Sequence, residues 1–489
     1  MKRIFVVLLL ALLVFSLAGC GGSGSSPLAT ADPAADPGTD PGTDPDTDPG
    51  TDPDTTIGGS LGTLTDIGDY LNAANEEWFF ATTIDINLSG QIIGESPLNN
   101  PIFWDPASPD SFTFIPSHWQ GMANGFGGFY DDFYNQKSDG GSNEFVAWEV
   151  LEINDNGLVL GNAYAGEGES RGFVWDSTNG NFTDLTPPSS YDNDGKRVVG
   201  QYSKAVDINA NGEILVDVEF DDGNIYAVYW DGVTTTSIDD LLDDNDIAVP
   251  AFNTPVYSGI PTILRSDASQ GVAMNDNGQF VTLSGGFGIY YDSTIGGWAS
   301  MNSLPGASES IVVDINNNKH AIGTSGSEGF FWRGGVMYPI SNPSGDSVEV
   351  VDINDNDIVV GNSGGQAFVW QLDPATDNGI FTSIGTLGGS SSTAVAINNQ
   401  DRVIGFSQTG NVYQEGNVTS AVVHGFLWQN DVMYDLGAHS PPNYTYPFDP
   451  DFYFSEATAI NENGDVTGKS YSINAHARGF TLTPVFPAP

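Results

Sequence analysis

Short apolar runs separated by polar turns recur along the chain from about residue 60 to its end. Within each run, Val, Ile, Leu and Phe alternate with small or polar residues, a pattern that is typical of β-strands. No segment beyond residue 60 keeps a helical period long enough to predict a helix. In triplets such as residues 173–175, the first and last side chains, Phe173 and Trp175, are expected to share one face and to pack between neighbouring sheets.

The runs belong to a repeated unit. An Ile-Asn step, once Met-Asn, occurs eight times, at Asn87, Asn154, Asn209, Asn275, Asn316, Asn354, Asn398 and Asn461. A Gly follows three residues later in five copies, and Lys319, Asp357 and Asp401 take its place in the others. A β-branched run, a strand that ends in an aromatic residue and a short fourth segment complete most copies.

Repeated units of four short strands predict an all-β fold, a β-propeller of four-stranded blades. We expect eight blades, or seven if the copy at 80–115 is a cap. The last copy lacks a clear fourth strand, whereas residues 61–68 read as a fourth strand without a unit of its own. We therefore predict that this N-terminal strand completes the last blade and closes the ring, which removes exposed sheet edges.

The connections between the strands, labelled a to d in each unit, predict two unlike faces. The a–b and c–d turns are short and share one face, since successive strands alternate in direction. The insertions at 116–146, 243–270 and 437–455 (d–a) and at 406–423 (b–c) fall on the other face. Two insertions are rich in aromatic residues that suit stacking on sugar rings or a protein partner, although they could instead pack on the ring. The candidate ligand-binding residues are Trp119, Phe126, Phe129, Tyr130, Phe133, Tyr134, Tyr444, Tyr446, Phe448 and Tyr453.

The first 59 residues predict a leader and a tether. Lys2 and Arg3 precede an apolar run at 4–17, which is the layout of a secretory signal and is shorter than the roughly 20 residues of a membrane span. Leu17-Ala18-Gly19-Cys20 resembles the lipobox of bacterial lipoproteins, which implies cleavage before Cys20 and its acylation. From Gly21 to Gly59 the chain consists mainly of Asp, Pro, Thr, Gly and Ser, a composition that favours an extended linker. The predicted organisation is a signal peptide at 1–19, a lipidated Cys and tether at 20–59, a propeller at 60–486 and a tail at 487–489.

Composition narrows the classes of function. With 63 acidic and 13 basic residues the net charge is −50, which disfavours nucleic acid and anionic lipid headgroups as partners. Cys20 is the only cysteine, so a disulfide or a cysteine-based metal site within one chain is excluded. No nucleophile elbow, phosphate-binding Gly loop or HExxH zinc motif is present, and the five histidines have no ligand spacing. Paired carboxylates for glycoside hydrolysis cannot be identified from the sequence.

The Asn turns resemble the start of a calcium loop, most closely in residues 207–212 (Asp-Ile-Asn-Ala-Asn-Gly). Position one is acidic in five copies but is Ala273, Ala396 or Ala459 in the rest. No copy has the closing Glu at position twelve, and position nine holds an apolar residue or Thr467. We therefore predict no metal or other cofactor, and we interpret the motif as a hairpin turn whose Asn side chain binds the turn's own amides.

The repeated unit resembles the HAF family of extracellular repeats, with its IN-x-x-G-x-V-V-G, AFLW and DLG segments. Residues 395–405, 424–428 and 432–437 match it closely, and the resemblance extends over 60–482. It implies a secreted or surface protein and carries no catalytic residues. We expect a monomer, lipid-anchored in a bacterial envelope at the outer membrane or cell surface, that binds extracellular glycan or protein without catalysis and contacts the membrane only through its anchor. The alternatives are a polysaccharide hydrolase or lyase and a calcium-dependent adhesin.

Overall fold

The computed structural model describes the chain from residue 56 to residue 486, with gaps. The described residues are 56–58, 61–62, 64–67, 70–71, 77–78, 82–96, 100–109, 111–115, 147–164, 170–185, 190–191, 197–198, 200–220, 225–230, 235–237, 269–415, 418–438, 454–471 and 477–486. They contain strands and turns and no helix, and therefore no helix that is long and apolar enough to cross a membrane.

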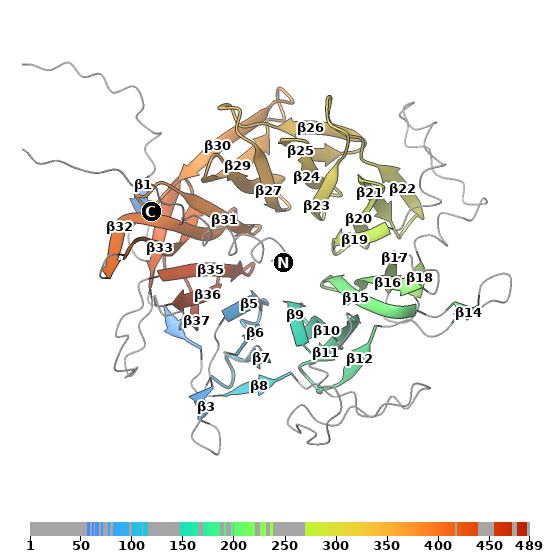
Figure 1. Ribbon diagram of the computed structural model, residues 1–489, viewed down its shortest axis with the longest axis horizontal. Helices are drawn as coiled ribbons and strands as arrows, with labels where there is room; N and C mark the ends of the chain where they lie inside the picture. The colour runs from blue at the N-terminus through green and yellow to red at the C-terminus, as the bar shows by residue number, and fades with distance from the viewer. Residues whose placement is uncertain are drawn as a thin grey trace, which may run out of the picture. The chain divides into compact units, whose positions relative to one another are not determined.

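Eight sheets form a ring, seven with four strands and one with a fifth strand added, so the prediction of an eight-bladed β-propeller is confirmed (Figure 1). The strands nearest the centre are β5, β9, β15, β19, β23, β27, β31 and β35, the a strands of the eight blades. Blade 1 consists of β5 (Thr82–Ile86), β6 (Ile92–Glu95), β7 (Pro101–Trp104) and β8 (Phe112–Phe114), and blade 2 of β9 (Ala147–Ile153), β10 (Leu158–Tyr164), β11 (Ser170–Asp176) and β12 (Phe182–Asp184). Blade 3 consists of β15 (Gly200–Ile208), β16 (Ile214–Phe220), β17 (Ile225–Trp230) and β18 (Thr235–Ser237). Blade 4 consists of β19 (Ser269–Met274), β20 (Gln279–Ser284), β21 (Phe287–Asp292) and β22 (Gly297–Ser300). Blades 5 and 6 are β23 (Ile311–Ile315), β24 (Ala321–Ser325), β25 (Glu328–Arg333) and β26 (Val336–Ile340); β27 (Val348–Ile353), β28 (Ile358–Ser363), β29 (Gln366–Leu372) and β30 (Gly379–Gly385).

Blades 7 and 8 receive strands from the start of the chain. Blade 7 is β31 (Ser392–Ile397), β32 (Val403–Glu415), β33 (Val418–Gln429) and β34 (Val432–Gly437), with β1 (Thr56–Gly58) added parallel to β34. Blade 8 is β35 (Phe454–Ile460), β36 (Val466–Tyr471) and β37 (Ala477–Leu482), and β2 (Thr65–Asp66) is its antiparallel fourth strand. The N-terminal strand therefore closes the ring as predicted. Two short hairpins, β3 (Tyr70–Leu71) with β4 (Glu77–Trp78) and β13 (Ser190–Tyr191) with β14 (Arg197–Val198), lie outside the blades.

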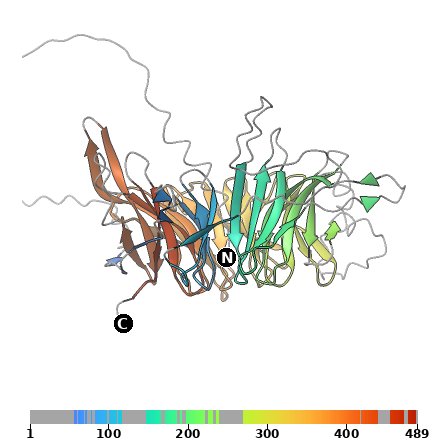
Figure 2. The ribbon, with the colours of Figure 1, turned by 90° about the horizontal axis from the view of Figure 1, so that it is seen from below.

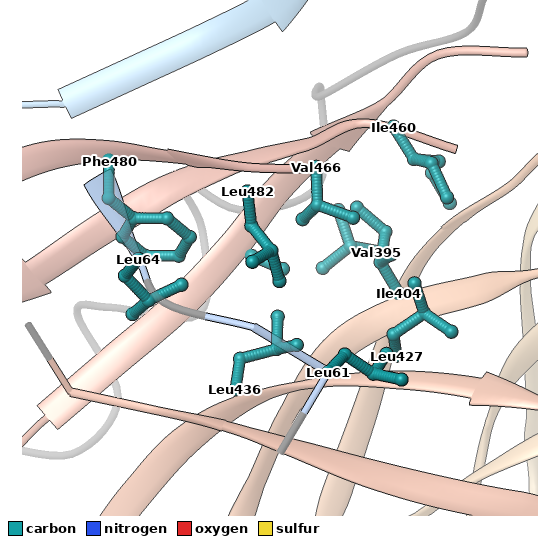
Figure 3. Packing of buried hydrophobic residues seen from close by; sticks show 12 residues of the cluster. Leu61, Leu64, Val395, Ile404, Leu427, Leu436, Ile460, Val466, Phe480 and Leu482 are labelled. Atoms are coloured by element: carbon teal, nitrogen blue, oxygen red, sulfur yellow. The ribbon is translucent and has the colours of Figure 1, made fainter. Parts of the chain in front are cut away.

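The segment between β1 and β2 seals the junction of the last two blades. Leu61 and Leu64 are buried against Leu427 and Leu436 of blade 7 and Phe480 of blade 8 (Figure 3). At about 25 cal/mol per Å² of buried apolar surface, two such leucines stabilise the closed ring by several kcal/mol. β1 lies in the segment predicted as tether, so the folded part begins a few residues before the predicted boundary at residue 60. The sequence did not indicate β1, because its three residues carry no alternating pattern.

Neighbouring blades pack face to face through the alternating side chains of their strands. Phe173 and Trp175 of β11 are buried toward blade 1, and Trp175 meets Phe103 edge to face with ring centroids 5.4 Å apart. Val174, between them, packs instead against Ala205 of blade 3. The prediction that residues 173 and 175 share one face and fill the space between sheets is confirmed.

Within most blades a glycine of strand b lies under an aromatic ring of strand c. Gly361 is opposite Phe368, and a Cβ at this glycine would meet the Glu349 carbonyl and the Phe368 ring. Where the b-strand residue is larger, as with Val216 and Thr282, the opposite residue is Val228 or Ile289. The paired volumes are complementary, as close packing requires.

The b–c connection at 406–423 is enlarged as predicted, and its described residues, 406–415 and 418–423, belong to strands. β32 and β33 extend past the rest of blade 7 as one antiparallel hairpin, with Glu415 opposite Val418 near the tip. Both arms contain β-branched or aromatic residues that favour a strand, among them Val412, Tyr413, Val422 and Val423. In Figure 2 this hairpin rises beyond the other strands of the ring, in orange-red.

Candidate functional site: the two faces of the ring

The a–b turns of the eight blades have one geometry, here illustrated by Asn154. Its side-chain Oδ1 accepts hydrogen bonds from the amides of Asn156 (3.1 Å) and Leu158 (3.0 Å). The residue three places after each Asn has a positive φ, including the non-glycine residues Lys319 (68°), Asp357 (60°) and Asp401 (59°). The interpretation of the motif as an Asn-directed turn with a left-handed residue is therefore confirmed. Lys319, a residue type that rarely has a positive φ, adopts the same conformation. Its Nζ lies 2.9 Å from the buried Asp292 carboxylate.

The same Asn side chains also join the blades, which sequence reasoning missed. Asn154 Nδ2 donates to the backbone carbonyl of Asn209 (3.1 Å), the corresponding Asn of the next blade. Every blade repeats this bond, and Asn461 Nδ2 donates to the Asn87 carbonyl (3.0 Å), so eight bonds form a closed circle. We call this circle the asparagine belt; its members are Asn87, Asn154, Asn209, Asn275, Asn316, Asn354, Asn398 and Asn461, all buried. The presence of Asn in all eight copies was the available signal, since a turn alone tolerates Asp or Ser.

Two of the three residues that replace glycine in the turns form hydrogen bonds with Asn side chains of the belt. In blades 6 and 7 the left-handed residues are Asp357 and Asp401, and their carboxylates accept from Asn316 Nδ2 and Asn354 Nδ2 of the preceding blade, each at 2.8 Å. Asp357 Oδ1 also lies 2.7 Å from His320 Nδ1. Although burial alone would raise the pKa of Asp357, the hydrogen bonds from His320 and Asn316 lower it below its usual value. The strained backbone is thus compensated by hydrogen bonds between blades.

A second, outer circle of amides surrounds the belt. Asn156 Nδ2 donates to the Ala210 carbonyl of the next blade at 2.7 Å. Asn211, Asn277, Asn318, Asn356, Gln400 and Asn463 make the corresponding bonds. Only the copy with Ser89 has no such bond among the described residues. The turn face is therefore largely occupied by contacts that hold the ring together.

The central channel opens on this face and is acidic. A cavity of about 160 Å³ is lined by residues from all eight blades, with Asp155, Asp276, Asp355 and Glu462 among the turn residues. Acids at position one of the motif join neighbouring blades by hydrogen bonds. Asp85 of blade 1 accepts from the Ile153 amide of blade 2 (3.0 Å). Asp207 accepts from Met274 (2.7 Å) and Asp352 from Ile397 (3.0 Å) in the same way.

Burial raises the pKa of Asp85 to about 6, even though the amides of Ile153 and Ile86 oppose the shift. Among the residues that the structure describes, no group of three or more His, Cys, Asp or Glu side chains is placed to hold a metal ion. Four of the five acids at position one, Asp85, Asp207, Asp314 and Asp352, accept a backbone amide of the next blade.

The opposite face, which we call the connecting face, carries the b–c and d–a links. Its described landmark is the β32–β33 hairpin, in which Val412 is 65% exposed. At the base of the hairpin, His424 Nδ1 lies 2.8 Å from the Asp435 carboxylate. Past Gln408 and Gly425, no described strand pairs with either outer edge of the hairpin. Both edges therefore present backbone groups on this face.

Several predicted site residues lie outside the described part of the chain. These are Cys20 and the aromatic candidates Trp119, Phe126, Phe129, Tyr130, Phe133, Tyr134, Tyr444, Tyr446, Phe448 and Tyr453. Of the five histidines, His320 and His424 are described, and each contacts an aspartate.

No family model and no curated protein matches the chain. Among solved structures it is similar to a chain of the mitotic checkpoint complex at 12% identity, covering 69% of this chain and 90% of that one, with a TM-score of 0.35. It is also similar to the propeller of Dos1, at 12% identity over 72% of this chain and 81% of that one, with a TM-score of 0.35. A third similar structure is YCF48 from Cyanidioschyzon merolae, at 10% identity over 75% of this chain and 95% of that one, with a TM-score of 0.34. No functional residue is transferred from these proteins.

Proposed function

We propose that this protein is a lipid-anchored, extracytoplasmic member of the HAF repeat family that acts as a non-catalytic scaffold, binding glycan or protein through its connecting face. The observation that carries the proposal is the difference between the faces. On the turn face, side-chain amides and carboxylates are engaged in bonds between blades. On the connecting face, the β32–β33 hairpin extends past its sheet and exposes side chains such as Val412.

A rigid ring suits this role because it can hold connecting segments at fixed positions without reorganising. Binding sites placed on loops over a rigid scaffold lose less entropy when a ligand arrives. The acidic composition favours a neutral or cationic ligand over an anionic one.

The test compares two forms of the mature chain. In the variant, residues 408–423 are replaced by Gly-Gly, the two-residue turn that joins β28 and β29 at Gly364 and Gly365 of blade 6. Both forms are applied to a glycan array and to isothermal titration with the array hits. Binding by the wild type that weakens at least tenfold in the variant supports the proposal.

The same assays separate the alternatives. Release of shortened sugars from a bound polysaccharide would favour a hydrolase or lyase and overturn the non-catalytic role. Binding that requires calcium would favour the adhesin. Lipidation is tested separately, through incorporation of labelled palmitate into the wild type and its loss in Cys20→Ala.

A further inference from the structure

In blades 2, 3 and 6, strand b carries a second contact that joins blades, made by the residue eight places after the belt Asn. In blade 2 this residue is Asn162, whose Oδ1 accepts from the Ala205 amide (2.7 Å) and whose Nδ2 donates to the Ala205 carbonyl (3.3 Å). In blade 6, Asn362 makes the same pair of bonds to Ala394, at 2.9 Å and 3.5 Å. One side-chain amide thus satisfies both backbone groups of a single residue on the next blade.

Blade 3 has Asp217 in this position. Its Oδ1 accepts from the Gly271 amide at 2.6 Å, as the asparagines do with Ala205 and Ala394. In the asparagine pattern, the second atom of the side chain faces the carbonyl of the same residue, which is here Gly271. An ionised carboxylate has no hydrogen to donate to that carbonyl, whereas a protonated carboxyl does.

The surroundings of Asp217 favour the protonated form. Burial raises its pKa to about 7, against the opposing effects of the Gly271 amide and the Lys204 charge. Lys204 lies opposite on β15, and Glu219 is two residues farther along β16. β17, β19 and β20, the other strands nearby, carry no charged residue.

The other border of blade 3 also contains a carboxyl contact. Glu152 of blade 2 occupies the position where four other blades have Asp and three have Ala, and its side chain forms a hydrogen bond with the Asp207 carboxyl of blade 3. Both carboxyl oxygens of Asp207 also accept backbone amides, Oδ1 from Ile208 and Oδ2 from Met274. Burial raises the pKa of Glu152 well above its usual value, and the charges of Asp207 and Asp85, which face it from β15 and β5, raise it further.

We propose that blade 3 is joined to its two neighbours through carboxyl protons, one donated by Asp217 to the Gly271 carbonyl and one held between Glu152 and Asp207. Loss of these protons to solvent loosens the ring on both sides of blade 3. The device adds pH-sensitive contacts to a ring whose eight belt bonds, from Asn side chains to backbone carbonyls, do not titrate.

The direction of the pH effect follows from linkage. The native pKa of Asp217, about 7, lies above its ordinary value of 3.8, so the folded chain keeps a proton that the unfolded chain has released. The stabilisation is complete below about pH 4 and is lost as the pH rises through 7. Glu152 changes stability in the same direction.

The experiment measures Tm of the mature chain between pH 5 and pH 9. In Asp217→Asn the amide donates at every pH, so its Tm should equal that of the wild type near pH 5 and exceed it by about 2 °C or more at pH 9. The control Glu219→Gln removes one charge from the same strand and should shift Tm by a constant amount. Parallel curves for Asp217→Asn and wild type would overturn the Asp217 half of the proposal.

Two further variants test the joint itself. Asn162→Asp places the carboxyl between blades 2 and 3 and should create a new fall in Tm as the pH rises. Glu152→Gln should reduce the dependence of Tm on pH that comes from the border between blades 2 and 3. An unchanged dependence would overturn the Glu152 half of the proposal. Hydrogen-exchange protection factors, which are corrected for the base-catalysed rise of the intrinsic rate, should fall in residues 200–230 of the wild type from pH 5 to pH 8. They should stay constant in the double variant Asp217→Asn, Glu152→Gln, and an equal fall of the protection factors in all blades would contradict a local joint.

Discussion

The two faces of this ring follow opposite rules. On the turn face, all eight blades keep the Asn of the belt, because each side chain must satisfy its own turn and the carbonyl of the next blade. On the connecting face, the b–c links range from the Gly364-Gly365 turn of blade 6 to the long hairpin of blade 7. A b–c link that makes no contact with the next blade can differ in length from blade to blade. An a–b turn whose Asn bonds the next blade keeps its sequence and its conformation. Stability and variability are therefore separated onto opposite sides of the molecule.

The largest effect is expected from breaking the belt. Asn154→Ala removes three hydrogen bonds in a buried position and leaves the Asn209 carbonyl without this donor. We expect the free energy of unfolding to fall by about 3 kcal/mol, measured by urea denaturation. The control Asn156→Ala removes one exposed outer amide and should cost about 1 kcal/mol or less.

The same variant also addresses calcium. Because four of the five acids of the motif accept backbone amides, 5 mM calcium should leave Tm unchanged in the wild type and in Asn154→Ala. A calcium-dependent rise in Tm that Asn154→Ala abolishes would show that the turn is a metal site after all.

A smaller effect is expected where backbone strain and belt bonds oppose each other. Asp357→Gly relieves a left-handed backbone, by about 1 kcal/mol, but removes the acceptor of Asn316 and His320. We expect a net loss of about 1 kcal/mol in the free energy of unfolding. Asn430→Gly is the matched control, since Asn430 has φ 53° on an exposed c–d turn and should gain a few tenths of a kcal/mol. A gain in both variants would mean that the Asp357 contacts contribute little.

The smallest effect on stability is expected on the connecting face. Replacing residues 408–423 by Gly-Gly should change the free energy of unfolding by about 1 kcal/mol or less, because the hairpin packs little of its length against the ring. Thermal unfolding followed by circular dichroism measures this directly. A loss above about 3 kcal/mol would make the hairpin part of the scaffold and erase the contrast between the faces.

Much of the fold follows from features that act within one repeat. The alternation of apolar residues in each strand, the Asn turn with its left-handed residue, and the missing fourth strand of the last unit predicted eight blades and the closure by residues 61–68. The enlarged b–c link at 406–423 was predicted, but its continuation of β32 and β33 as strand was not, because polar residues such as Gln408 and Asn411 do not indicate a strand when they are read singly. The aromatic candidates of the two insertions stay predictions, since they lie outside the described residues.

By itself, the sequence determined the repeated hairpins, their number and the chain segment that closes the circle, because strand alternation and turn geometry depend on residues only a few positions apart. Only the tertiary structure decided what the repeated side chains do across blades. Asn154 and Asn209 are 55 positions apart in the chain, and their bond exists only when the ring brings successive turns together. The role of Asp217, which stands where blades 2 and 6 have Asn, likewise depends on the tertiary structure, because its partner is the Gly271 amide on the next blade.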